Sequence, residues 1–119
     1  MDNRPKTIFC DIDGTLIKHK GNQTQQIVQT PELLPGAIEK INEWDKKGYQ
    51  LILITGRRES LKKITEKQLL SLGIFYDKLI MGVSSGERII INDLKQDSKK
   101  LTASAYCPPR NFGLEEVEV

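Results

Sequence analysis

The sequence predicts one α/β domain over residues 1–119, built on a doubly wound and mostly parallel sheet. Short apolar runs at residues 6–11, 49–54 and 88–91 each lead into polar groups, which is typical of buried parallel strands with functional side chains at their carboxyl ends. Segments with apolar residues at helical spacing follow the first two runs. With 119 residues, the chain is long enough for one hydrophobic core and too short for a core with a substantial cap.

Two carboxylates follow the first run directly. Ile8–Cys10 predicts a short buried strand, and Asp11 and Asp13 fall where that strand must end, before Gly14. Ligands of open α/β sheets bind at the carboxyl ends of the strands, so both acids are expected to meet a substrate or an ion. The alternative is a purely structural turn, because Asp-Gly alone is common turn chemistry.

The polar, glutamine-rich segment 16–30 predicts a hairpin that acts as a flap over this strand end. His19 lies in it between two lysines, a setting more typical of a solvated loop tip than of a ligand. Beyond the flap, Pro35 and the helical spacing of apolar residues through Trp44 predict a helix that Gly48 ends.

The second strand, residues 49–54, ends in Thr55, Gly56 and Arg57, directly before a helical pattern over residues 59–72. The threonine hydroxyl can donate to a phosphoryl oxygen, and the glycine lets the backbone approach closely. Free N–H groups at the helix start also suit an anion. Arg57 could add positive charge for the same anion, although an arginine at a helix start is more often solvated.

The remaining strands are shorter. Residues 79–81 predict a third strand, and the run 88–91 predicts a further one that ends in Asn92 and Asp93. Residues 101–106 are compatible with an edge strand. Three strand ends would therefore deliver polar groups to one edge of the sheet.

This constellation resembles the haloacid dehalogenase superfamily of phosphohydrolases. Asp11 and Asp13 match its first motif, Thr55 its second, and Asp93 with Asn92 its fourth. The resemblance implies a Rossmann-like, capless domain with a flap, similar to small bacterial members that act in polysaccharide and sugar phosphate metabolism. It also implies hydrolysis of a phosphomonoester through an aspartyl phosphate, with Asp11 as the nucleophile and Asp13 as the proton donor and acceptor.

The resemblance further implies Mg²⁺ as cofactor, bound by the side chains of Asp11 and Asp93 and the backbone carbonyl of Asp13. Asn92 stands where many relatives have an acid, and would hold a coordinated water. The third motif of the family, a lysine or arginine that neutralises the phosphate, has no clear match. Several residues remain open for this role: Lys95, which is best placed by reach, Lys62, Lys63, Lys78, and Arg88, which is expected to fall short at the far end of its strand.

The composition limits the classes of partner that this chain is expected to bind. The formal charge of +2 carries no basic block, so no nucleic acid partner is expected, and no apolar stretch is long enough to span a membrane. A start without an apolar core indicates a cytoplasmic protein. Cys10 and Cys107 lack metal-ligand spacing. We expect a small phosphomonoester substrate, such as a sugar phosphate, and an open site that a second copy of the chain could cover.

Two other functions remain open. The first is a binding or regulatory module that keeps the fold without useful turnover, which the missing third-motif base favours. The second is a phospho-accepting receiver domain, which shares an acidic strand end but gives no reason for Asp-Gly-Thr. Retention of both aspartates of the first motif favours the enzyme.

Overall fold

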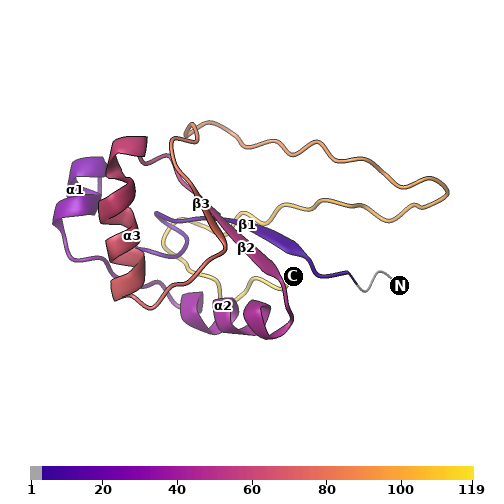
Figure 1. Ribbon diagram of the computed structural model, residues 1–119, viewed down its shortest axis with the longest axis horizontal. Coiled ribbons are helices and arrows are strands. Elements are labelled where there is room, and N and C mark those ends of the chain that lie inside the picture. The colour runs from indigo at the N-terminus through magenta and orange to yellow at the C-terminus, as the bar shows by residue number, and fades with distance from the viewer. Residues whose placement is uncertain (1–3) are drawn as a thin grey trace.

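A computed structural model describes residues 4–119 and has a three-stranded parallel sheet at its centre (Figure 1). The strands are β1 (Thr7–Asp11), β2 (Gln50–Ile54) and β3 (Lys78–Ile80), in the order β1-β2-β3. Asp11 pairs in register with Ile54, and Ile54 with Ile80, so all three strands end at one edge. This confirms three predicted strands and the Rossmann-like parallel arrangement.

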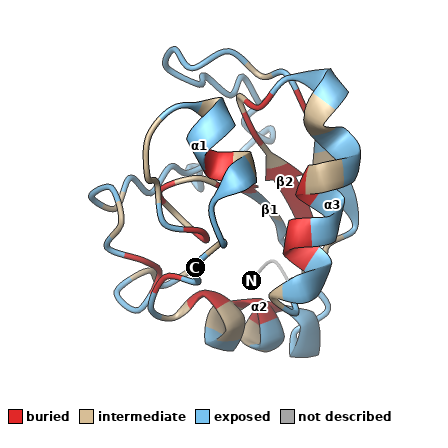
Figure 2. Cartoon of the chain, turned by 90° about the vertical axis from the view of Figure 1, so that its left-hand side faces the viewer, coloured by how far each residue is buried: buried red, intermediate tan, exposed pale blue. Residues whose placement is uncertain are grey.

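Helices form the two crossovers between these strands. Helix α2 (Ala37–Lys46) links β1 to β2, and its buried stripe includes Trp44. The turn η1 (Glu59–Leu61) and helix α3 (Lys62–Ser71) link β2 to β3. Figure 2 shows that the buried parts of these helices face the central strands.

The core forms where the inward faces of β1 and β2 meet these helices. Its fully buried members share an apolar side chain and an exposure of 2% or less: Ile12, Leu16, Ile17, Ala37, Ile41, Trp44, Leu53 and Leu69. Cys10 is buried among them, and burial, together with the charge of Asp11, raises the pKa of its thiol to about 12. The thiol therefore stays protonated near neutral pH, as expected for a residue that packs a strand.

The predicted flap contains a helix and is not the continuous hairpin that was expected, although Ile17 at its start pairs antiparallel with Leu33. Helix α1 (Gln23–Val28) begins at Asn22, whose side chain accepts a hydrogen bond from Gln25 N–H, while the Gln25 side chain accepts one from Asn22 N–H. This reciprocal capping box stabilises the start of a short helix. A glutamine-rich segment with such a box favours a helix over two paired strands.

The predicted strand at residues 88–91 is also absent. Residues 86–105, which we call the arm, extend away from the body of the molecule and return (Figure 1). Ile91 is 94% exposed, and Thr102 Oγ1 donates to the Asp93 carbonyl across the two runs of the arm. The reason is the length of the connection: only residues 81–87 separate β3 from this run. A crossover to another parallel strand needs about a dozen residues or more.

Without that strand, β1 stays at the edge of the sheet in the described part of the chain, and the sheet is not doubly wound. The run 101–106, which covers the last residues of the arm and Tyr106 after it, is not a strand. None of the helices within residues 4–119 is long and apolar enough to cross a membrane.

Candidate functional site

The loop after β1 carries the two aspartates of the first motif. The carbonyl of the fully buried Ile12 accepts hydrogen bonds from the N–H groups of Thr15, Leu16 and Ile17, at 3.2, 2.8 and 3.0 Å. Gly14 makes this tight turn possible with a φ of +89°, a conformation that favours glycine. The loop is thus a fixed platform at the carboxyl end of β1.

Asp11 lies at this strand end beside a positive charge. Its Oδ1 is 3.8 Å from the guanidinium of Arg88, at the base of the arm, and both side chains are about one-third exposed. Burial raises the pKa of the Asp11 carboxyl above its ordinary value, and the charge of Arg88 opposes that rise. The Ile12 N–H and the Thr15 hydroxyl also lower the pKa of the Asp11 carboxyl, whereas the charge of Asp13 raises it.

Asp13 is held by an arginine from the loop after β2. Arg57 Nε donates to Asp13 Oδ2 at 2.8 Å, and Arg57 NH2 donates to Oδ1 at 2.7 Å. Gln26 of α1 adds a third hydrogen bond, from Nε2 to Oδ1 at 2.7 Å. Arg57 is only 2% exposed, so it is committed to Asp13 and does not face solvent as the predicted phosphate contact would.

The NH1 group of Arg57 completes a closed network of hydrogen bonds. Arg57 NH1 donates to Gln68 Oε1 at 2.6 Å and to Thr65 Oγ1 at 3.0 Å, both on α3. Gln68 Nε2 in turn donates to the Gln26 carbonyl at 2.9 Å, which leads back to Asp13. The network joins the loops after β1 and β2 to α1 and α3, and its side chains are mutually satisfied.

The second motif lies next to this network. Thr55 is buried, and its Oγ1 accepts a hydrogen bond from Arg57 N–H at 3.1 Å, which leaves the hydroxyl proton free to donate. A Cβ at Gly56 would lie 3.2 Å from the Val83 carbonyl oxygen, so glycine allows this close approach. The Gly56 carbonyl itself accepts a bond from Gln23 Nε2 of α1 at 3.3 Å.

Asp93 and Lys95 are not brought to the site. Both are exposed on the arm, where the Lys95 carbonyl accepts the Ser98 N–H of the turn at the tip. Asn92 lies there too, with its Nδ2 3.5 Å from the Thr102 carbonyl oxygen. The absence of the predicted strand explains this, because no parallel strand carries these side chains back to the edge where Asp11 lies.

The predicted Mg²⁺ ligands do not assemble. Haloacid dehalogenase-like phosphatases generally use Mg²⁺, which takes several oxygen ligands. Here the Asp13 carboxylate already accepts three hydrogen bonds, Arg88 lies beside Asp11, and Asp93 is on the arm. Within residues 4–119, no three carboxylate, histidine or cysteine side chains are close enough to hold a metal ion. This donor set does not fit the ion.

Sequence reasoning missed two contacts of the site. Arg88 reaches Asp11 because the arm begins at the carboxyl end of the sheet, which the short connection after β3 could have revealed. Gln26 reaches Asp13 from a segment whose helical capping box was visible in the sequence.

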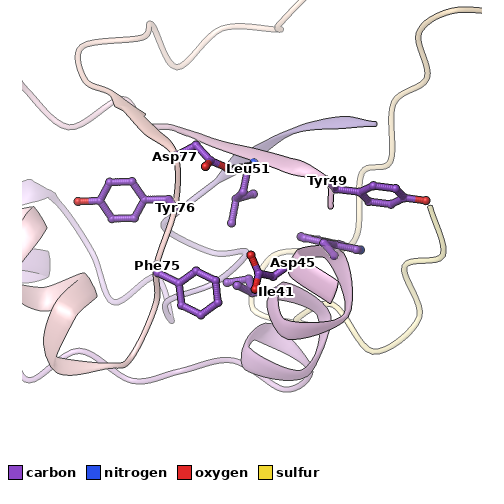
Figure 3. A pocket seen from close by; sticks show the side chains of 8 residues that line it. Ile41, Asp45, Tyr49, Leu51, Phe75, Tyr76 and Asp77 are labelled. Atoms are coloured by element: carbon purple, nitrogen blue, oxygen red, sulfur yellow. Dashed lines mark hydrogen bonds between the residues drawn. The ribbon is translucent and has the colours of Figure 1, made fainter. Parts of the chain in front are cut away.

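A small pocket of about 50 Å³ lies at the other end of the strands (Figure 3). Leu51, near the start of β2, and Asp77, before β3, line it, and Asp77 Oδ2 accepts the Leu51 N–H at 2.7 Å. The rings of Tyr49 and Tyr76 point away from each other, so they do not enclose a ligand. This pocket is separate from the aspartates.

One protein-family model matches most of this chain. The model of the PITM 1-3, LNS2 domain matches residues 8–106, which include β1, both motif aspartates and the arm. The chain belongs to the LNS2 domain family. The LNS2 domain is itself haloacid dehalogenase-like, but its family is not that of the sugar phosphatases, so the expected likeness to polysaccharide and sugar phosphate enzymes was wrong.

Two solved structures resemble this LNS2 domain. A chain in the structure of the Pnkp1/Rnl/Hen1 complex is 29% identical, with a TM-score of 0.58, over 71% of this chain and 30% of that one. A chain in the structure of the Pnkp1/Rnl/Hen1 RNA repair complex is 28% identical, with a TM-score of 0.59, over 71% of this chain and 28% of that one. The LNS2 domain therefore spans less than a third of either neighbour.

The second of these structures contradicts the expectation that nucleic acid plays no part, because the similar chain is a component of an RNA repair assembly. The expectation rested on the weak net charge, which says little about a local site. A search of curated proteins found no match. The LNS2 family is phosphatase-related, and the fold is that of a small α/β domain.

Proposed function

We propose that this LNS2 domain hydrolyses a phosphomonoester at the end of a nucleic acid, with Asp11 as the nucleophile. The proposal depends on one observation: the two carboxylates of the loop after β1 have different arginine partners. Asp11 lies beside the guanidinium of Arg88, whereas both oxygens of Asp13 accept hydrogen bonds from Arg57. The phosphatase-related family supports the chemistry, and the likeness to chains of an RNA repair complex supports the substrate class.

In the first step, an oxygen of Asp11 attacks phosphorus while the bond to the leaving oxygen breaks, which gives an aspartyl phosphate. Asp13, which enters this step protonated, gives that proton to the leaving oxygen. Of the two Asp13 oxygens, Oδ1 accepts two hydrogen bonds and Oδ2 accepts one, so Oδ2 keeps the lone pair that can carry this proton. In the second step, water attacks phosphorus, the bond to Asp11 breaks, and Asp13 takes up the proton of the water.

Arg88 supplies the positive charge that the missing third motif would provide. Its guanidinium already lies beside Asp11, and a planar guanidinium matches the geometry of a phosphate. The Thr15 hydroxyl, which lowers the pKa of Asp11, can donate to a phosphoryl oxygen as negative charge develops there.

The test compares wild type with Asp11→Asn on p-nitrophenyl phosphate and on single-stranded oligonucleotides that carry a 3′- or 5′-phosphate, in Mg²⁺-containing buffer. We expect wild-type hydrolysis, its loss in Asp11→Asn, and a hydroxylamine-labile phosphoryl-protein intermediate in wild type. Asp97→Asn, on the exposed arm, is the matched control and should retain activity. Hydrolysis that survives Asp11→Asn would refute the mechanism, and an inactive wild type would favour a binding module.

A further inference from the structure

Arg110 lies over the loop that carries the two aspartates. A Cβ placed on Gly14 would lie 3.2 Å from Arg110 Cγ and 3.7 Å from His19 Cβ, so the aliphatic part of Arg110 covers this glycine. Gly14 is three residues from Asp11, which puts their Cα atoms within about 10 Å of each other. Arg110 is exposed, and its guanidinium has no ion pair with any described carboxylate.

Asn111 fixes Arg110 in this place. The Asn111 N–H donates to the Gly14 carbonyl at 2.8 Å, its Oδ1 accepts the His19 N–H at 2.7 Å, and its Nδ2 donates to the His19 carbonyl at 3.2 Å. Its φ of +65° is left-handed, a conformation that most side chains avoid and asparagine tolerates. Three hydrogen bonds thus hold an uncommon backbone conformation against the catalytic loop.

A hollow of about 440 Å³ lies beside the segment that contains Arg110 and Asn111. Its lining includes Pro109 and Phe112, which flank Arg110 and Asn111, and also Tyr106 and Glu116. Phe112 is 64% exposed and Tyr106 is 55% exposed. Exposed aromatic rings next to an exposed arginine suit single-stranded nucleic acid, because bases can stack on the rings while the cation meets the backbone.

We propose that Arg110 binds the phosphodiester next to the terminal phosphate, and that the hollow lined by Tyr106 and Phe112 receives the attached nucleotide. This inference rests on the proposed function and narrows its substrate to a single-stranded nucleic acid end longer than one nucleotide. Arg88 then faces the phosphate that is removed and Arg110 the phosphate that remains. Stacking on aromatic rings tolerates any base, so the subsite reads the presence of a strand and not its sequence.

The experiment compares kcat/KM for three substrates: a single-stranded oligonucleotide with a terminal phosphate, the matching mononucleotide, and p-nitrophenyl phosphate. Arg110→Met keeps the stem over Gly14 and removes the charge, while Arg110→Lys keeps a charge. We expect Arg110→Met to lower oligonucleotide kcat/KM about tenfold or more, to leave p-nitrophenyl phosphate unchanged, and to reduce the salt slope of oligonucleotide KM by about 1. Arg110→Lys should recover part of the loss.

Phe112→Leu tests the hollow, and Phe75→Leu in the separate pocket of Figure 3 is its matched aromatic control. We expect only Phe112→Leu to weaken the oligonucleotide. Equal losses on all three substrates, or a wild type that shows no preference for the oligonucleotide over the mononucleotide, would overturn the inference while the hydrolase proposal stands. Failure of wild type on every substrate would instead refute the proposed function.

Discussion

Arg57 donates to both carboxylate oxygens of Asp13, from Nε at 2.8 Å and from NH2 at 2.7 Å. The pair joins the loops after β1 and β2, and the arginine is buried with its remaining donor directed to α3. A buried charge of this kind depends on its partners, since loss of one member leaves the other uncompensated.

Arg57→Ala should therefore destabilise the protein strongly. We expect the free energy of unfolding to fall by about 3–5 kcal/mol, because Asp13, Thr65 and Gln68 all lose a donor. Chemical denaturation measures this. Arg58→Ala is the control, since Arg58 is exposed and should change stability by less than about 0.5 kcal/mol. Similar small effects of both variants would contradict the network.

Arg88→Ala should change both the rate and its pH dependence. The charge of Arg88 lowers the pKa of Asp11, so its removal raises that pKa, and the acid limb of kcat/KM moves to higher pH because attack needs the ionised carboxylate. We also expect kcat to fall about a hundredfold. A pH series from acid to neutral on p-nitrophenyl phosphate measures both, with Lys95→Ala as the control. An unmoved acid limb would show that Arg88 does not act on Asp11.

Asp93→Asn should leave turnover within about twofold of wild type. Asp93 is exposed on the arm and has no part in the network around Asp11 and Asp13. The measurement is kcat/KM in the same Mg²⁺-containing buffer used for Asp11→Asn. A loss as large as that of Asp11→Asn would mean that the arm brings Asp93 to the site during catalysis.

Two glycines with similar backbone conformations should differ in their tolerance of alanine. Gly48 has a φ of +74° and open space around it, so Gly48→Ala should cost about 1 kcal/mol of stability from backbone strain alone. Gly113 has a φ of +86°, and a Cβ there would lie 2.2 Å from the Pro35 carbonyl oxygen, so Gly113→Ala should cost about 3 kcal/mol or more. Thermal unfolding compares them, and equal shifts would contradict the packing of the C-terminal segment.

Local patterns were sufficient to predict β1, β2, β3, α2 and α3, because each has its apolar residues and terminators within one short segment. The prediction of a strand at the run Ile89–Ile91 was wrong, because an apolar run predicts burial only if the chain can return it to the sheet. Residues 81–87 are too few for that return.

The site was only partly predictable. Asp11, Asp13 and Thr55 follow their strands directly, so their approximate positions came from the strands themselves. The pairing of Asp13 with Arg57 spans 44 positions, and that of His19 with Asn111 spans 92, so neither leaves a local pattern. Such contacts depend on how the finished chain packs.

The link between His19 and Asn111 also sets the order in which the site is completed during synthesis. The aspartate loop is synthesised before Asn111, which follows 92 positions after His19 and therefore roughly 5 to 20 seconds of translation later. A nascent chain that already contains Asp11 still lacks Asn111, and with it the contact of Arg110 with nucleic acid that we propose. Under this proposal, selective activity requires synthesis to have passed Asn111.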